Sequence, residues 1–216
     1  MAGSRPRTRS CAGKGSDGPV IYLVRHGQTE FNRERRIQGH VDSPLTELGV
    51  RQAKAVARLL RDLIGEPDGW RIVSSPLGRA HATAELIAAK LGALPVEIDD
   101  RLMEMSWGAY DGRLRAELEA EEPDTFGKTG WAFDSGAGES YEAVSSRVGD
   151  WLASLPPEPR RRIIAVSHGI SGRVLRGLYA NLDRDEASLQ DVPQDAVYLL
   201  QHGGVGRIDC EPLEDL

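Results

Sequence analysis

The chain has 216 residues, of which 40% are hydrophobic and 28% are charged. This length suits an α/β domain with a sizeable core, and the composition is that of an ordinary soluble protein. The formal net charge of −6, from 33 acidic and 27 basic residues, argues against nucleic acid or an anionic membrane as the main partner. The two cysteines, Cys11 and Cys210, form no CxxC pair, so they indicate neither a disulfide framework nor a metal site and fit a reducing cytoplasm.

The first 18 residues are rich in Arg, Ser and Gly and contain no apolar run. Because a secretory signal needs an apolar core, the sequence predicts a disordered N-terminal tail over 1–18 and a single domain over 19–216. No stretch of the chain approaches the ~20 apolar residues that cross a bilayer. We therefore expect no membrane partner.

The first predicted element is a strand over 20–24, where five apolar residues run directly into Arg25-His26-Gly27. A short apolar run ended by glycine is typical of a buried parallel strand that opens into a loop. In an open α/β sheet, ligands bind at the carboxyl ends of such strands. The residues after this strand are therefore candidates for a site.

A polar loop is predicted over 31–44, followed by a helix that Thr46 caps and Gly65 ends. The next strand, 71–75, leads into a helix predicted from Pro76 to Leu91, with Ser75 as its N-cap. Arg79 then falls in the first helical turn, where free N–H groups and the helix dipole favour an anion. A short strand is expected over 95–99.

Residues 101–138 form the least regular part of the chain and are predicted to be a lid-like insertion, since long loops in compact domains tend to be functional. The aromatic residues of this stretch are Trp107, Tyr110, Phe126, Trp131 and Phe133. The alternative is that these aromatics simply pack on the domain.

The C-terminal third predicts a helix capped by Ser140, a strand over 163–167, and a helix over about 170–179. A closing hairpin is expected from 197–200 and 205–210, joined at Gly203-Gly204. The strand over 163–167 ends in His168-Gly169, so three predicted strands deliver two histidines and two arginines towards one edge of the sheet.

Two arginines beside two histidines are suited to binding a tetrahedral oxyanion, because the planar guanidinium matches phosphate geometry and stays charged. A histidine among fixed positive charges favours its neutral, nucleophilic form. Guanidinium groups can neutralise a transferring phosphoryl group without Mg²⁺, whereas a leaving alkoxide still needs a carboxylic acid. A zinc site is the competing hypothesis, but the chain has no HExxH motif and two arginines would repel the cation.

The motifs just described resemble those of the histidine phosphatase superfamily, which has the phosphoglycerate-mutase-like fold. The match runs from about Val20 to Gly206 in the family order. The matching blocks are Arg25 to Asn32, Gln38-Gly39 with Pro44 to Gly49, Ser74 to Ala80, Leu102 to Glu104 with Trp107 to Gly112, Gly138 to Ser140, and Val166 to Gly169.

This resemblance implies a three-layer α/β/α sandwich with a mostly parallel central sheet. It implies that His26 is the nucleophile that forms a phosphohistidine, that His168 hydrogen-bonds the transferring phosphoryl group, and that Glu104 protonates the leaving oxygen. It also implies that Arg25 and Arg79 clamp the phosphoryl oxygens and that no metal or cofactor takes part. The positions that match substrate-contacting residues of the family are Asn32, Gln38, Gly39 and Gly169. The alternative for Glu104 is a solvated loop carboxylate. His40 is expected to be an exposed loop residue, with a place at the mouth of the pocket as the alternative.

The superfamily contains phosphatases and mutases, and the lid-like insertion is expected to separate them. Between Ala116 and Ser146 the chain has one basic residue, Lys128, and eight acidic ones. An acidic lid disfavours a polyanionic substrate. The sequence therefore predicts a metal-independent hydrolase of a small phosphomonoester, with a phosphoglycerate-type phosphomutase, a phosphoprotein phosphatase and a non-catalytic binding module as alternatives. The oligomeric state is not indicated by the sequence.

Overall fold

The computed structural model describes residues 20–126, 136, 138–157 and 161–212. The predicted tail over 1–18, together with Lys128, Trp131 and Phe133, lies outside the described residues.

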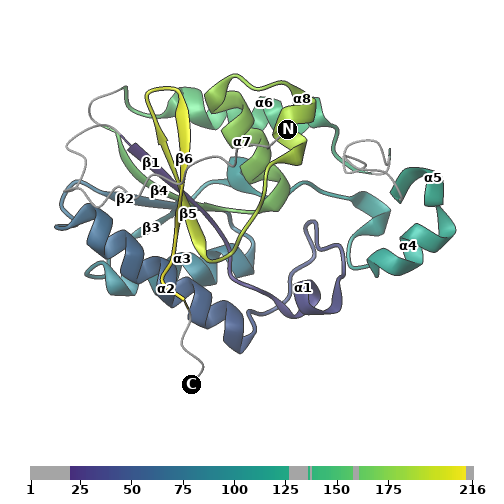
Figure 1. Ribbon diagram of the computed structural model, residues 1–216, viewed down its shortest axis with the longest axis horizontal. Coiled ribbons are helices and arrows are strands. Elements are labelled where there is room, and N and C mark those ends of the chain that lie inside the picture. Colours follow the sequence, from purple (N-terminus) through teal and green to yellow (C-terminus); the bar gives the residue numbers. More distant parts are fainter. Residues whose placement is uncertain (1–19, 127–135, 137, 158–160, 213–216) are drawn as a thin grey trace, which may run out of the picture.

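Within these residues, one six-stranded sheet has the order β3-β2-β4-β1-β5-β6 (Figure 1). The strands are β1 (Val20–Arg25), β2 (Arg71–Ser74), β3 (Val96–Ile98), β4 (Arg162–Ser167), β5 (Ala196–Gln201) and β6 (Gly204–Asp209). The first four are parallel to one another, whereas β5 runs antiparallel to β1 and forms the predicted hairpin with β6. The sheet is therefore mixed and mostly parallel, as predicted.

Helices cover both faces of the sheet (Figure 1). One face packs on α2 (Glu47–Ile64) and α3 (Gly78–Lys90), and the other on α6 (Tyr141–Ser154) and α7 (Gly169–Ala180). Because side chains alternate along a strand, Tyr22 of β1 packs in the core on the α2 and α3 side, and Leu23 packs in the core on the α6 and α7 side. The three-layer α/β/α prediction is confirmed.

The helix boundaries follow local capping. Thr46 accepts a hydrogen bond from the Gly49 N–H and begins α2, and Gly65 ends it, as predicted. Helix α3 begins at Gly78, two residues later than predicted, because the Ser75 hydroxyl accepts the Leu77 N–H in a turn instead of capping the helix. Arg79 still lies in the first turn.

The predicted loop over 31–44 is partly wrong, because α1 (Glu30–Glu34) occupies its start. Thr29 and Asn32 form a reciprocal capping box that stabilises this single turn. A second capping box, between Asp183 and Glu186, begins α8 (Arg184–Leu189), which the sequence pattern also did not predict. Such short helices have no apolar periodicity to reveal them.

The stretch 101–138 is more regular than predicted. It contains the 3-10 turns η1 (Asp100–Leu102) and η2 (Gly108–Tyr110) and the helices α4 (Arg115–Glu121) and α5 (Pro123–Phe126). Trp107 and Phe126 are buried in the core cluster that contains α6 and α7, and Tyr110 packs against it. The three described aromatic residues of this stretch, Trp107, Tyr110 and Phe126, therefore all pack on the domain. None of the described helices is long and apolar enough to cross a membrane.

Candidate active site

The carboxyl ends of β2, β4 and β1 lie side by side, so the residues that follow these strands meet at one edge of the sheet. The backbone N–H of His26 donates to the Ser167 carbonyl at 3.1 Å, and that of Ser75 donates to the Val166 carbonyl at 3.0 Å. These bonds extend the ladder one residue past the strands and fix where the following side chains begin.

A cavity of about 310 Å³ opens at this edge. Seven predicted site residues line it: Arg25, His26, Asn32, Gln38, Gly39, Arg79 and Glu104. His168 lies directly behind, with its ring centroid 5.1 Å from that of His26. Gly169 does not line the cavity, but its backbone N–H donates to Glu104. The structure therefore brings all nine predicted positions together, and their roles stay predictions.

His26 is buried and its ring has a defined orientation. Its Nδ1 lies 2.8 Å from the Gly27 carbonyl oxygen, which can only accept a hydrogen bond. The ring proton therefore sits on Nδ1, which leaves a lone pair on Nε2. Burial and the neighbouring charges of Arg25 and Arg79 lower the pKa of His26 well below its ordinary 6.5, so the neutral imidazole dominates at neutral pH.

The two arginines are held by backbone carbonyls. Arg25 donates to the Val192 carbonyl at 2.5 Å, and Arg79 donates to the Gly39 carbonyl at 2.7 Å and to Asp42 at 3.0 Å. The Nε atoms of Arg25 and Arg79 are buried and have no hydrogen-bond partner within the described residues. Burial lowers the pKa of Arg25 to about 10, so it remains a cation at neutral pH.

His168 is also buried, and its Nε2 lies 2.8 Å from the Ser75 hydroxyl. Its Nδ1 is a third buried polar atom without a partner in the described part of the chain. Burial, with Arg79 and the other nearby cations, lowers the pKa of His168 well below its ordinary value. Ser75 was predicted to cap the following helix, but it does not, and its hydroxyl contacts His168 instead.

Glu104 is not a solvated loop carboxylate, since only 9% of it is exposed. Its Oε2 accepts the Gly169 N–H at 3.0 Å, and its Oε1 accepts the Ser171 N–H at 3.0 Å and the Met105 N–H at 3.0 Å. The Glu104 carboxyl group thus lies against the N-terminus of α7, whose free N–H groups fix its position.

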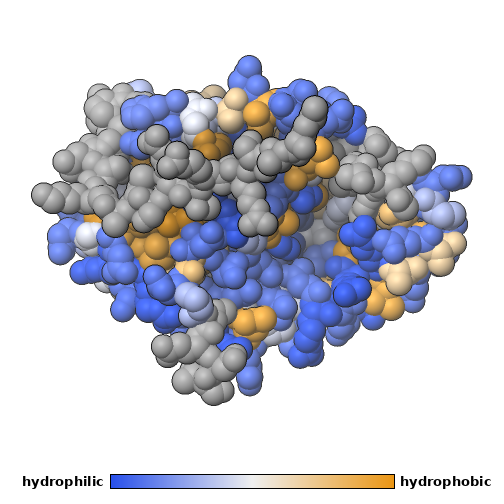
Figure 2. Space-filling model, viewed as in Figure 1, coloured by the Kyte–Doolittle hydropathy of each residue, from blue (hydrophilic) through white to orange (hydrophobic). Residues whose placement is uncertain are grey.

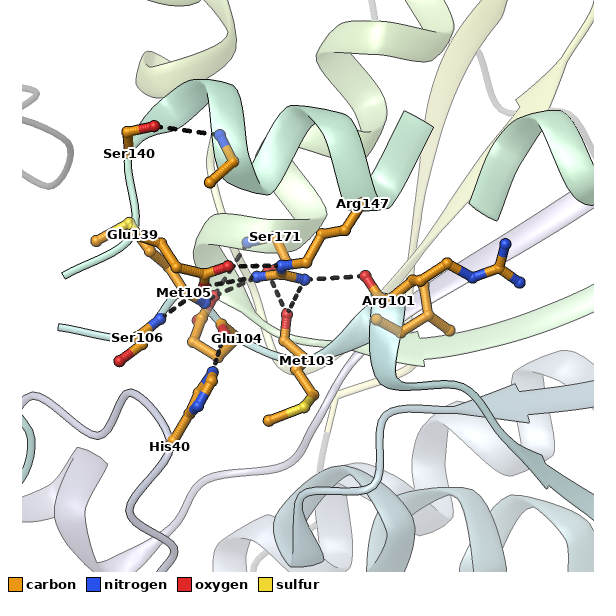
Figure 3. Close-up of polar contacts among 12 residues, drawn as sticks. His40, Arg101, Met103, Glu104, Met105, Ser106, Glu139, Ser140, Arg147 and Ser171 are labelled. Carbon is orange, nitrogen blue, oxygen red and sulfur yellow. Dashed lines mark hydrogen bonds and ion pairs between the residues drawn. The ribbon is translucent and has the colours of Figure 1, made fainter. Parts of the chain in front are cut away.

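A clamp made by Arg147 and Glu139 holds the segment that carries Glu104 (Figure 3). Arg147 reaches from α6 and donates to the carbonyls of Arg101 and Met103 at 2.9 and 2.8 Å. It also pairs with Glu139 at 2.9 Å, and Glu139 accepts the Ser106 N–H at 2.9 Å. The backbone is therefore tied down on both sides of Glu104.

The predicted substrate-contacting residues form a second connected group. Gln38 donates to the Thr29 hydroxyl at 2.5 Å, and Thr29 caps the turn that carries Asn32. Gln194 donates to the His26 carbonyl at 3.1 Å and to the Asn32 side chain at 3.0 Å. Sequence reasoning missed Gln194, because it lies in an irregular loop outside every motif.

His40 was predicted to be an exposed loop residue. It is exposed, yet its Nε2 lies 2.9 Å from the Glu104 carbonyl oxygen and its backbone N–H donates to Asp111. It therefore links the loop after α1 to the segment that carries Glu104.

Apart from Glu104, the described acidic residues of the lid-like insertion do not line the cavity. Glu119 pairs with Arg115, Glu121 pairs with Arg113, and Glu122 accepts the Tyr110 hydroxyl. Three further arginines do line it, namely Arg35, Arg36 and Arg115. The cavity lining in the described part of this stretch therefore gives no support to the prediction that an acidic lid disfavours a polyanionic substrate, and that prediction stays untested. No group of three His, Cys, Asp or Glu residues that could hold a metal occurs among the described residues.

Comparisons with known proteins agree on one family. A family model described as the histidine phosphatase superfamily (branch 1) matches residues 21–208. Relatives from Salmonella paratyphi C (strain RKS4594) and Cronobacter sakazakii (strain ATCC BAA-894), both named probable phosphoglycerate mutase GpmB, are 41% identical over 155 residues, which is 70% of this chain and 70% of each relative.

Two of the similar solved structures are phosphatases. A mycobacterial glucosyl-3-phosphoglycerate phosphatase in complex with VO3 has a TM-score of 0.70 and 30% identity, covering 84% of this chain and 90% of that one. An α-ribazole phosphatase from Shigella flexneri has a TM-score of 0.70 and 25% identity, covering 88% of this chain and 95% of that one.

Proposed function

The chain belongs to the histidine phosphatase superfamily, and from this premise we propose that it hydrolyses a small phosphomonoester through a phosphohistidine on His26. One observation carries the proposal. The Nε atoms of Arg25 and Arg79 are buried donors without partners in the described residues, and both arginines line the same cavity as the neutral His26. Buried donors are normally paired, so two unpartnered guanidinium donors beside a nucleophile fit a tetrahedral oxyanion.

In the first step, the His26 Nε2 lone pair attacks phosphorus and the bond from phosphorus to the ester oxygen breaks. Glu104 gives its proton to the leaving oxygen, and Arg25 and Arg79 neutralise the phosphoryl oxygens. In the second step, Glu104 takes a proton from water as the water oxygen attacks phosphorus. The phosphorus–nitrogen bond then breaks, which releases phosphate and restores both His26 and protonated Glu104.

The roles of His26 and Glu104 separate in a leaving-group experiment. His26→Ala is expected to abolish phosphoenzyme formation with every substrate. Glu104→Gln is expected to lower the pre-steady-state burst of an alkyl phosphate by about 10²–10⁴-fold but to spare the burst of p-nitrophenyl phosphate, because nitrophenolate leaves without a proton. An equal loss in both bursts would make Glu104 a positioning group that caps α7.

We further propose that hydrolysis needs no divalent metal, because the guanidinium groups supply the positive charge at the phosphoryl oxygens. Activity is expected to survive exhaustive EDTA treatment. Activity that EDTA removes and that Zn²⁺ or Mg²⁺ specifically restores would overturn this part of the proposal.

We also propose that residues 19–216 fold as one domain that follows the tail 1–18, and that the protein works in the cytoplasm. Brief proteolysis that removes only the tail and leaves activity intact would support the first. Cell fractionation that recovers the protein with the membrane or the exterior would contradict the second.

The names of the relatives limit the class of substrates to test but do not identify one substrate. Their names refer to phosphoglycerate mutase, glucosyl-3-phosphoglycerate phosphatase and α-ribazole phosphatase, and a cavity of about 310 Å³ is at the small end for ligand sites. Phosphate release from a panel of phosphorylated metabolites tests the proposal directly. If the pure protein releases phosphate from none of them, the proposed function fails.

A phosphomutase is the second candidate, and one observation favours it. Within the described part of the lid-like insertion, Glu121 pairs with Arg113 and Glu122 accepts the Tyr110 hydroxyl, both outside the cavity lining. Glu119 pairs with Arg115, which lines the cavity together with Arg35. These two arginines favour the binding of a doubly charged donor. Transfer of label from the phosphoenzyme to an added acceptor alcohol in competition with water would reveal mutase activity.

A further inference from the structure

A second group of arginines lines the outer part of the cavity. Arg35 and Arg115 are exposed and Arg36 is half-buried, whereas Arg79 is buried and the Nε of Arg25 is buried. Among the lining residues within the described chain, Glu104 is the one carboxylate. Figure 2 shows hydrophilic residues across the middle of the visible face, beside the lobe that Figure 1 labels α4 and α5. The mouth is therefore strongly positive although the chain is acidic overall.

Two segments far apart in sequence build this mouth together. The backbone N–H of Arg115 donates to the Arg35 carbonyl at 3.1 Å, and Arg36 bridges Leu114 in antiparallel fashion. Arg35 ends α1 as its C-cap in the left-handed conformation, with φ 58° and ψ 38°, and its backbone N–H donates to the carbonyls of Phe31 and Asn32. This turn sets Arg35 beside Arg115 at the rim of the site.

These three arginines differ in whether a nearby carboxylate neutralises their charge. Arg36 pairs with Glu34 and also donates to the Gly112 carbonyl, and Arg115 pairs with Glu119. Arg35 has no carboxylate within ion-pair distance and no side-chain hydrogen bond among the described residues. Its guanidinium group is thus an uncompensated charge at the cavity mouth.

We propose that Arg35, with Arg115 beside it, forms a subsite for a second anionic group of the substrate. The substrate class is then a small phosphomonoester that also carries a carboxylate or a second phosphate. The phosphoryl group lies against Arg25 and Arg79, and the second anion extends outward to Arg35. This inference rests on the proposed function for the inner site, but its binding chemistry can be tested without turnover.

The first experiment measures binding of non-hydrolysable ligands by calorimetry. Phosphonocarboxylates of two to five carbons are each compared with the alkylphosphonate of equal length, in which a methyl group replaces the carboxylate. At one chain length or more, the wild-type protein is expected to bind the phosphonocarboxylate about tenfold more tightly, as a charge-assisted hydrogen bond allows. Arg35→Gln is expected to remove most of this preference.

Arg33→Gln is the matched control. Arg33 is an exposed arginine of the same short helix α1, it pairs with Glu30, and it does not line the cavity. This variant is expected to keep the wild-type preference. Equal binding of both ligands by the wild type at every chain length would overturn the proposal, as would a preference that survives Arg35→Gln.

The second experiment measures kcat/KM for 3-phosphoglycerate against glycerol 3-phosphate, and for fructose 1,6-bisphosphate against fructose 6-phosphate. The first pair tests a carboxylate and the second pair tests a phosphate as the second anion. Arg35→Gln is expected to lower kcat/KM more for the doubly anionic member of at least one pair. Wild-type hydrolysis without preference in either pair would contradict the subsite alone, whereas absence of all hydrolysis beside a retained phosphonocarboxylate preference would contradict the proposed function alone.

Discussion

At the scale of single residues, the candidate site combines neutral imidazoles with charged guanidinium groups in one buried space. Burial disfavours the charged form of both groups, but their ordinary pKa values differ. It lowers the pKa of His26 well below 6.5, whereas it lowers the pKa of Arg25 only to about 10. At neutral pH the histidine is therefore uncharged and the arginine is cationic. Nucleophilic attack on a phosphoryl dianion needs this pairing.

The lowered pKa values predict how stability depends on pH. His26 and His168 resist protonation in the folded protein but titrate near 6.5 when unfolded, so the unfolded chain binds more protons below that pH. The free energy of unfolding is therefore expected to be unaffected by these groups above pH 6.5. Below it, stability should fall by up to ~1.4 kcal/mol per pH unit for each histidine, down to its folded pKa.

Urea unfolding of the wild type and of His168→Gln between pH 5 and pH 8 checks this. The variant is expected to lose less stability than the wild type between pH 6.5 and pH 5. His81→Gln, which removes an exposed histidine paired with Glu85, is the control and should keep the wild-type slope. Identical slopes for His168→Gln and the wild type would show that His168 is not held neutral by the fold.

Residues at the ends of strands could be predicted from sequence, whereas those that support them could not. Arg25, His26 and His168 follow apolar runs that announce the strands, so their meeting point was predictable from parallel-sheet topology. Gln194 and Arg147 contact the site across 162 residues and 44 residues of sequence respectively. No local pattern encodes such contacts, because they exist only after the elements have packed.

At the scale of elements, α6 acts on the site through one side chain. Arg147 donates to the carbonyls of Arg101 and Met103, which precede Glu104, and to Glu139, so it couples the helix to the segment 101–106 (Figure 3). Without this guanidinium group, the Met103 carbonyl keeps only the Ser171 hydroxyl and Glu139 keeps the Ser106 N–H. Losing these charge-assisted bonds costs on the order of 1–3 kcal/mol and releases the segment.

Arg147→Met is therefore expected to mimic a damaged leaving-group acid. If Arg147 positions Glu104, hydrolysis of an alkyl phosphate falls about tenfold more than hydrolysis of p-nitrophenyl phosphate, and Arg147→Lys recovers part of the difference. Burst kinetics with both substrates measure this selective loss. Arg101→Met, which removes an arginine paired with Asp99, is the control. A loss of the same size with both substrates would indicate that Arg147 only stabilises the fold.

The start of α2 and the loop after β1 approach each other more closely than side chains permit. A Cβ added at Gly49 would lie 2.0 Å from the Gln28 carbonyl oxygen, and one added at Gly27 would lie 2.3 Å from the Gly49 carbonyl oxygen. Since backbone atoms form both contacts, no rotamer change relieves them. These glycines therefore set the path of the loop that carries His26.

Substituting alanine for two helical glycines is expected to have opposite effects. Gly49→Ala in α2 should lower the free energy of unfolding by about 1–3 kcal/mol, as overpacking does. Gly149→Ala in α6 should raise it by about 0.5–1 kcal/mol, because the nearest atom, a Leu178 methyl carbon, is 3.8 Å away and alanine favours helix. Chemical denaturation measures both, and a loss of similar size in the two variants would contradict the close-approach argument.

At the scale of the whole molecule, the layered fold could be predicted and the short capped helices could not. The long helix α2 has a strong helical period and β1 is a continuous apolar run, so both appear in the sequence pattern. Helices α1, α4 and α8 are polar and short. The first and last begin at capping boxes, whereas α4 has no side-chain cap and follows a bridge between Leu114 and the distant Arg36. Part of the cavity mouth is built from α1 and α4, so its arginines were not foreseen.

The distribution of charge over the molecule gives the last prediction. The chain carries a net charge of −6, but the cavity is lined by five arginines and one glutamate. With a Debye length of ~8 Å at physiological salt, the local field dominates for a ligand at the mouth. The kcat/KM for a doubly anionic substrate should therefore fall as NaCl rises from 20 to 300 mM, and Arg35→Gln should flatten this dependence. Arg71→Gln changes the net charge equally, but Arg71 pairs with Glu97 at the amino end of β2, away from the cavity, so it should keep the wild-type slope. A kcat/KM that rises with salt would show instead that the overall negative charge governs the approach of the substrate.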